Sequence, residues 1–190
     1  MLNPVRALAL AGLLCLGAGR TGAAAVQPDT SGLQFLGFRA GARLEELDTQ
    51  LRHLGGQALR CRRSKIDRHV SECRAALSEP ELGGVVDLWV SAIDSVAGVI
   101  TLSGTVAPGQ LDRWRQVLQE RYGRVGPRIQ GTQSMLQWVR RGRMLRLTWR
   151  MERSGKVASV SLVDGRVLDE WGRSRRSTPA MRPSGERRGA

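Results

Sequence analysis

The feature that most constrains the fold of this chain is a series of short segments in which apolar and polar residues alternate. A period of two places successive side chains on opposite faces of a strand, one toward a core and one toward solvent. Glycine, serine and aspartate separate most of these segments, which is typical of hairpins. We expect eight strands, at residues 33–38, 57–62, 69–75, 85–93, 99–105, 135–140, 143–151 and 157–163.

Two longer segments carry apolar residues at helical spacing instead. Residues 42–54 place leucines on one stripe and stop at Gly55-Gly56, and residues 108–122 begin with a proline and stop at Gly123. Proline is favoured in the first turn of a helix, and glycine is favoured just after the last turn. The sequence therefore predicts an α+β fold in which two helices pack on an antiparallel sheet, in the order β-α-β-β-β-β-α-β-β-β.

The two predicted helices also align with one another at an offset of 67 residues. The matched pairs are Leu44 with Leu111, Leu47 with Trp114, Leu51 with Leu118 and Gly56 with Gly123. Any two helical stripes share part of this agreement, but the terminal glycines agree as well. An internal duplication, with halves at residues 32–105 and 106–171, is one interpretation.

The first 25 residues predict export. Residues 1–6 form a short basic segment that ends at Arg6, and residues 7–19 are uncharged and rich in leucine and alanine. Ala23-Ala24-Ala25 then supplies the small residues of a cleavage site. This is the order of a secretory signal peptide. Its apolar run is shorter than the about 20 residues that a membrane-spanning helix needs. We expect residues 1–25 to be removed and the mature protein to be periplasmic or extracellular, with no transmembrane segment.

Three cysteines bear on the same question, and Cys15 leaves with the signal peptide. Cys61 and Cys73 remain as an even pair in an oxidising compartment, which predicts a disulfide. Hairpin pairing about residue 67 would put them directly opposite one another. A lipid anchor at Cys15 is disfavoured by Leu14, where such sites carry a small residue. A zinc site would need further ligands, and the usual short-spaced cysteine pair is absent, so we expect no metal and no cofactor.

The formal net charge of +13 is concentrated in two regions. Residues 121–153 hold nine arginines against Glu152 alone. Residues 172–190 are rich in arginine, serine and glycine and lack apolar periodicity, so we expect a disordered basic tail there. Residues 26–31 are expected to be a flexible lead, which leaves residues 32–171 as a single domain.

Arginines on the predicted strand at residues 143–151 point to a partner. Arg146 and Arg150 lie four apart and share one face, and Arg140 on the preceding strand is close enough to join them. We expect these three residues to form an anion-binding face for an anionic envelope component or an acidic protein surface. A genome that favours arginine codons is the alternative source of this charge. Export argues against a nucleic-acid partner.

No catalytic constellation stands out. A Ser-His-Asp arrangement would have to use His53 or His69, and no G-x-S-x-G turn is present. Both histidines are expected to be exposed or structural. The carboxylates Glu45, Glu46 and Asp48 lie in the first turns of a predicted helix, where they oppose the positive end of its dipole. We therefore expect a protein that is not an enzyme.

The motif Gly37-Phe38-Arg39-Ala40-Gly41, followed by the leucine stripe and Gly55-Gly56, resembles the opening of small bacterial envelope domains of the BamE type. In the second half, Tyr122-Gly123, Gln137-Trp138 and residues 143–149 look similar. Tandem copies of such units also resemble the architecture of the beta-lactamase inhibitory protein. The resemblance covers about residues 33–165 and implies an exported protein that binds other macromolecules without catalysis. We therefore expect a cell-envelope binding or scaffolding module, with a secreted hydrolase or hydrolase inhibitor as the alternative.

Overall fold

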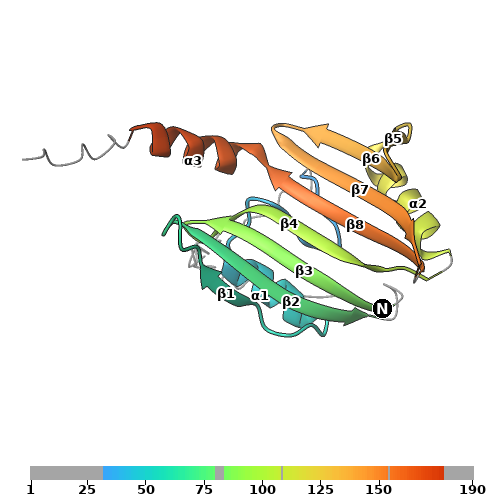
Figure 1. Ribbon diagram of the computed structural model, residues 1–190, viewed down its shortest axis with the longest axis horizontal. Helices are drawn as coiled ribbons and strands as arrows, with labels where there is room; N and C mark the ends of the chain where they lie inside the picture. The colour runs from blue at the N-terminus through green and yellow to red at the C-terminus, as the bar shows by residue number, and fades with distance from the viewer. Residues whose placement is uncertain (1–31, 80–83, 108, 154, 178–190) are drawn as a thin grey trace, which may run out of the picture. The chain divides into compact units, whose positions relative to one another are not determined.

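The computed structural model describes residues 32–79, 84–107, 109–153 and 155–177 (Figure 1). The predicted signal peptide, the predicted lead and the end of the predicted tail lie outside the described residues. The helices are α1 (Leu44–His53), α2 (Gln110–Tyr122) and α3 (Gly165–Ser177). The strands are β1 (Arg60–Arg63), β2 (Val70–Glu79), β3 (Gly84–Ile93), β4 (Val96–Thr105), β5 (Arg128–Gln130), β6 (Gln133–Arg140), β7 (Arg143–Glu152) and β8 (Gly155–Asp164).

The eight described strands form one antiparallel sheet in the order β1-β2-β3-β4-β8-β7-β6-β5. Each half of the chain contributes one helix followed by four consecutive strands. The two four-stranded units meet at the β4–β8 pair in the middle of the sheet, where Thr101 lies opposite Ser161 (Figure 1). The connectivity therefore repeats, and the two halves share one continuous sheet.

The predicted architecture, with only two helices on a sheet and the order β-α-β-β-β-β-α-β-β-β, is wrong in three places. Residues 33–38 do not form a strand, because Phe35 and Phe38 pair with each other across a turn. Leu36 and Gly37 in that turn both adopt positive φ angles, of 51° and 80°, so the chain reverses within the segment. Residues 128–130 add the short edge strand β5, which the alternation pattern did not reveal because only three residues pair.

The third difference is helix α3, which the sequence analysis did not anticipate. It extends through Ser177, so the predicted boundary at residue 172 falls inside it. Val167 and Leu168 lie against Gly98 of β4, where an added side chain would contact both. The helix packs through only a few apolar residues among many arginines and serines. Because this composition is typical of disordered segments, it predicted a disordered tail instead.

The start of α3 is anchored by the buried carboxylate of Asp164, which is only 1% exposed. Its Oδ1 accepts the backbone N–H of Arg166 at 3.0 Å, and its Oδ2 accepts Nε of Arg143 at 2.7 Å. Burial by itself would raise the pKa of this carboxyl, but the hydrogen bonds from Arg166 and Arg143 outweigh it and hold the pKa below its ordinary value. Gly41 passes close by, and any side chain there would collide with Asp164.

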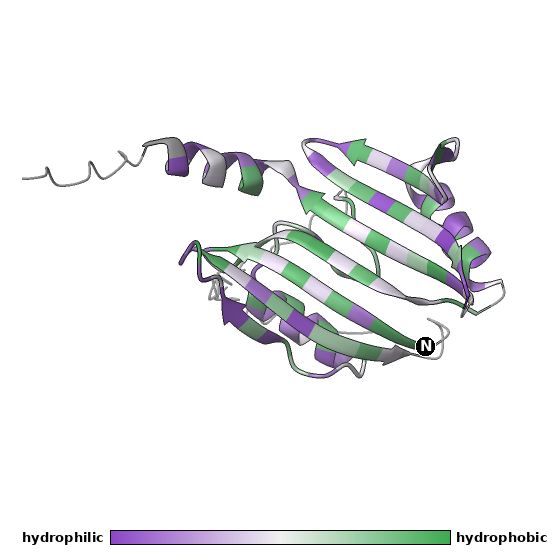
Figure 2. Cartoon of the chain, in the orientation of Figure 1, coloured by the Kyte–Doolittle hydropathy of each residue, from purple (hydrophilic) through white to green (hydrophobic). Residues whose placement is uncertain are grey.

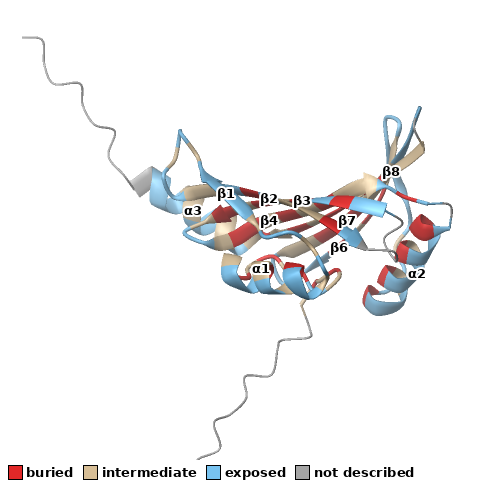
Figure 3. Ribbon diagram, turned by 90° about the horizontal axis from the view of Figure 1, so that it is seen from below, coloured by how far each residue is buried: buried red, intermediate tan, exposed pale blue. Residues whose placement is uncertain are grey.

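The core lies between the sheet and the helices α1 and α2, which both cover the same face (Figure 3). Leu47 and Leu51 of α1 and Leu118 of α2 are fully buried against inward-facing strand residues. The loop before α1 links the halves of the core, since Phe35 contacts Trp114 edge to face with ring centroids 5.2 Å apart. Such aromatic pairs add about 1 kcal/mol beyond their buried area.

The predicted disulfide is confirmed. Cys61 on β1 lies directly opposite Cys73 on β2, and their sulfurs are bonded. Cys73 is fully buried and Cys61 is exposed, so the bridge joins the edge strand to the core. The hairpin register about residue 67 is the one that the sequence predicted.

Candidate binding surface

The face of the sheet opposite α1 and α2 is the candidate binding surface, and we call it the open face. Figure 1 looks onto it, and none of the described helices crosses its middle. Apolar and polar residues alternate along the strands (Figure 2), because inward-facing side chains enter the core and outward-facing ones remain. The outward set in the centre is rich in serine and threonine, and its members are partly exposed.

One row of side chains crosses seven strands of the open face in continuous register, and we call it the central row. Each member lies opposite the next on the adjacent strand. From β1 to β6 the row contains Arg60, Arg74, Trp89, Thr101, Ser161, Arg146 and Gln137. Adjacent strands are about 4.8 Å apart, so the row is roughly 29 Å long.

The centre and one end of this row are held by hydrogen bonds. The hydroxyls of Thr101 and Ser161 lie 3.2 Å apart where β4 meets β8. Farther along the row, Nε and Nη2 of Arg146 donate to Oε1 of Gln137 at 3.1 and 2.9 Å. The Arg146 guanidinium is therefore oriented before any partner arrives, which lowers the entropy that binding would cost.

The three arginines predicted as an anion-binding face are not all on one face. Arg146 and Arg150 share the open face, as the alternation predicted. Arg150 is in an ion pair with Glu152, with Nε at 2.7 Å from Oε1. Arg140 lies on the helix-covered face, where its Nη2 donates to the Tyr122 carbonyl at 2.7 Å. Arg140 lies two residues after the buried Trp138 on the same strand, and residues two apart share one face of a sheet. This spacing could have placed Arg140 on the helix-covered face.

Arginines from the other half of the sheet were missed by the sequence analysis. Arg60, Arg62 and Arg74 are exposed on the open face near its β1 edge. Alternation along β1 and β2 could have placed these arginines on one face, as it did for Arg146 and Arg150. The open face thus has cations toward both edges, with Trp89 and a band of hydroxyl groups between them.

A cavity of about 410 Å³ lies where α3 meets the β1–β2 loop and the β3–β4 turn. Its apolar lining includes Ile93, Val96, Val167 and the ring of Trp171. This volume is at the lower end of the range for small-molecule pockets. The cavity combines residues from three parts of the chain that no local sequence pattern connects.

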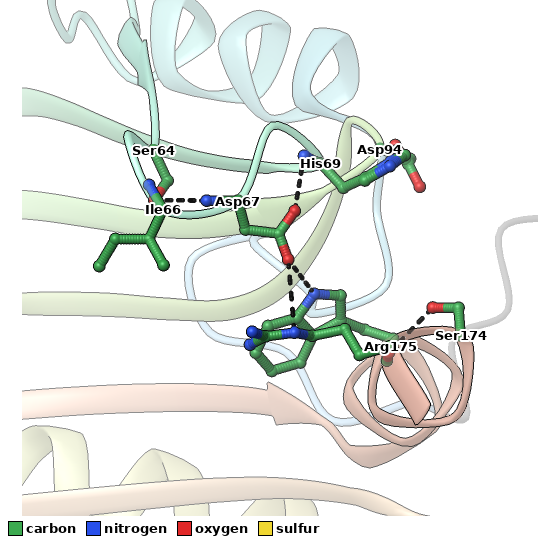
Figure 4. A network of polar contacts seen from close by, with 8 residues as sticks. Ser64, Ile66, Asp67, His69, Asp94, Ser174 and Arg175 are labelled. Atoms are coloured by element: carbon green, nitrogen blue, oxygen red, sulfur yellow. Dashed lines mark hydrogen bonds and ion pairs between the residues drawn. The ribbon is translucent and has the colours of Figure 1, made fainter. Parts of the chain in front are cut away.

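Asp67 is the centre of the polar network beside this cavity (Figure 4). One carboxylate oxygen accepts the backbone N–H of His69 at 2.9 Å, and the other accepts the indole N–H of Trp171 at 2.9 Å. The backbone hydrogen bond from His69, followed by the bond from Trp171, lowers the pKa of Asp67 below its ordinary value. Arg175 approaches the same carboxylate, with Nε 3.9 Å away.

His69 also forms a side-chain pair, with its Nδ1 at 2.8 Å from Oδ1 of Asp94. The pairing of Val70 with Ile93 brings these residues together although they are distant in sequence. About half of the His69 side chain is exposed, and within the described residues no hydroxyl or thiol is bonded to it. The pair therefore lacks the nucleophile that a hydrolytic triad requires.

Among the described residues there is no group of three or more histidine, cysteine, aspartate or glutamate side chains suited to a metal ion. In the same part of the chain, no helix has the length and apolar character needed to cross a membrane. Comparison with protein-family models, with curated proteins and with solved structures finds no match to this chain.

Proposed function

We propose that this protein is a non-catalytic binding module of the cell envelope that holds an acidic protein partner on the open face. The observation that carries the proposal is the central row, in which a partly exposed tryptophan and an oriented arginine flank a band of small hydroxyl side chains. Trp89 and Arg146 are of the residue types that dominate the energetics of protein interfaces. Serine and threonine between them leave the surface flat enough for a broad contact.

The size of the open face is consistent with a protein partner. Five of its strands have ten residues each, which corresponds to about 33 Å along the strand direction. Together with the roughly 29 Å length of the central row, this makes an area of about 960 Å². A standard protein interface takes about 800 Å² from each partner.

Charge indicates the chemistry of that partner. Arg74 and Arg146 lie on either side of the centre of the row, four strands apart, or about 19 Å. Opposing acidic side chains at a similar spacing would meet both cations, which favours fast association and a defined orientation. The predicted export and the disulfide are what support an envelope location.

Site-specific photo-crosslinking tests this proposal in the cells that make the protein. A photoreactive residue replaces Ser159, on the open face beside the centre of the row, or Arg113, which is exposed on α2. We expect a discrete protein adduct from position 159, lost when Trp89 is also changed to alanine, and none from position 113. Equal adducts from both positions, or no protein adduct from position 159, would contradict the proposal.

A further inference from the structure

The tip of the β1–β2 loop, residues 64–69, exposes an apolar side chain that the proposed function does not use. Ile66 is 91% exposed, more than any other large apolar residue in the described part of the chain. Figure 4 shows its side chain directed away from the polar network of the loop. An isolated exposed residue is common on protein surfaces, so its meaning depends on how the loop is held and on what surrounds it.

Hydrogen bonds within the loop hold its shape. The Ser64 hydroxyl accepts the backbone N–H groups of Ile66 at 3.2 Å and of Asp67 at 3.4 Å. The backbone of Ser64 donates to the Val70 carbonyl at 2.8 Å, and Val70 donates to the Asp67 carbonyl at 3.0 Å. These bonds close a tight turn and leave Ile66 at its outer edge.

Contacts with the rest of the protein brace the same turn. The Asp67 carboxylate binds the Trp171 indole of α3, and the Cys61–Cys73 disulfide joins the two strands below the loop. The backbone of Asp94 donates to the His69 carbonyl at 2.9 Å, which fixes the other side. The loop is therefore prevented from folding Ile66 back onto the protein surface.

Four cations flank the exposed isoleucine in the sequence, two at the end of β1 and two in the loop. Arg62, Arg63, Lys65 and Arg68 are all exposed, and none of them forms an ion pair with another described residue. Glu72 is the nearby exposed carboxylate of the hairpin, and it lies opposite Arg62 in the strand register. This end of the hairpin thus presents one apolar side chain near positive charges that form no ion pair with described residues.

We propose that this loop docks the protein on an anionic lipid bilayer, with Ile66 inserted at the boundary between headgroups and acyl chains. The polar groups that could give directional recognition, the Ser64 hydroxyl and the Asp67 carboxylate, are already bonded within the protein. What remains for a partner is an apolar side chain and long, mobile cations. These fit a fluid anionic interface better than a structured protein surface, where defined hydrogen-bond geometry is the rule.

This inference concerns a different surface from the central row and does not rest on the protein partner proposed above. A bilayer contact through the loop would leave Trp89 and Arg146 for that partner. The two proposals together describe a scaffold that holds an acidic protein near a membrane. Each can fail without the other, because Trp89→Ala is expected to leave bilayer binding unchanged.

Sedimentation of the mature chain with lipid vesicles tests the docking proposal. The vesicles are phosphatidylcholine alone, or equal parts phosphatidylcholine and phosphatidylglycerol. We expect binding to the anionic vesicles only, weakened by added salt. Ile66→Ser should lower the partition coefficient about tenfold, since the inserted apolar surface is lost. Lys65→Gln with Arg68→Gln should lower it about twenty-five-fold, because each cation contributes about fivefold near an anionic surface.

Matched variants at the far edge of the sheet separate the loop from general charge and hydrophobicity. Ile129→Ser removes another highly exposed isoleucine, on β5, and Arg113→Gln with Arg124→Gln removes two exposed cations. Both controls should bind vesicles within about twofold of the wild-type chain. The docking proposal is overturned if Ile66→Ser binds anionic vesicles like wild type, or if the controls lose as much binding. Failure of the wild-type chain to bind anionic vesicles, with capture of a protein that depends on Ile66, would assign the loop to a protein partner instead.

Discussion

Trp171 in α3 donates its indole N–H to the Asp67 carboxylate in the β1–β2 loop at 2.9 Å, although 104 residues separate the two. The bond connects the last described helix with the hairpin that carries the disulfide. Helix α3 thereby supports the β1–β2 loop, which is too short to stabilise its own conformation through many internal contacts. The conformation of the loop should then depend on a residue outside the hairpin.

Replacing Trp171 with phenylalanine tests this dependence, because it keeps a ring and removes the donor. Amide hydrogen exchange in residues 64–70 should become about fivefold faster, since one hydrogen bond no longer opposes local opening. Exchange in the central strands should not change. Trp149→Phe is the control, since no hydrogen bond is made by the Trp149 indole in the described structure. Equal effects of the two changes on the loop would show that the Asp67 bond does not support it.

The buried Asp164 carboxylate predicts a specific loss of stability in acid. Its pKa is lowered in the folded protein, so its contribution is fully present above the ordinary aspartate pKa and is lost as the pH falls through the lower, native value. At neutral pH, Asp164→Asn should reduce the free energy of unfolding by about 3 kcal/mol, because Arg143 loses its buried partner.

The pH dependence distinguishes this explanation from simple loss of packing. Denaturant unfolding of the wild type and Asp164→Asn should give stabilities that approach one another below about pH 4. A difference that stays constant from neutral pH into acid would mean that the charge on Asp164 does not stabilise the fold.

The Cys61–Cys73 bridge should contribute about 3 kcal/mol, because it closes a short loop and restricts the unfolded chain. Changing both cysteines to serine should lower the thermal midpoint by several degrees, and reducing agent should do the same to the wild type. The double variant serves as its own control, since reducing agent should not affect it. Two free thiols in the wild-type protein purified without reducing agent would contradict the assignment.

Some of this structure was predictable because the relevant information is local in sequence. The cysteine pair is equidistant from the turn at residue 67, so hairpin pairing alone brings the sulfurs together. The faces of β7 followed from alternation, which correctly put Arg146 and Arg150 on one side. Arg140 lies two residues after Trp138, so the same alternation puts both side chains on one face. The prediction for Arg140 rested on its charge instead, and therefore placed it on the wrong face.

Other features could not be predicted because they depend on tertiary contacts. Nothing local pairs His69 with Asp94, which meet only because β2 and β3 are neighbours. Helix α3 packs through few apolar residues, and its charged remainder is typical of disorder. The central row exists only once all of the cross-strand registers are known, so composition could reveal its arginines but not their alignment.

The corrected position of Arg140 gives a comparison between two arginines. Arg140→Gln should destabilise the fold by about 1 kcal/mol, because the Tyr122 carbonyl at the end of α2 loses a charged donor. Arg150→Gln breaks an exposed ion pair with Glu152 and should change stability by about 0.5 kcal/mol or less. Denaturant unfolding of the two variants checks the order. A larger loss for Arg150→Gln would contradict these placements.

The most direct test of the open face is to titrate the chain with a simple acidic polypeptide. Poly-L-glutamate added to ¹⁵N-labelled protein that lacks residues 1–25 should shift the Trp89 indole N–H resonance and leave that of the buried Trp138 unchanged. Arg146→Gln and added salt should both reduce the shift, because the contact is electrostatic. Absence of a Trp89 shift, or a shift that Arg146→Gln does not reduce, would contradict the account of the open face as the binding surface.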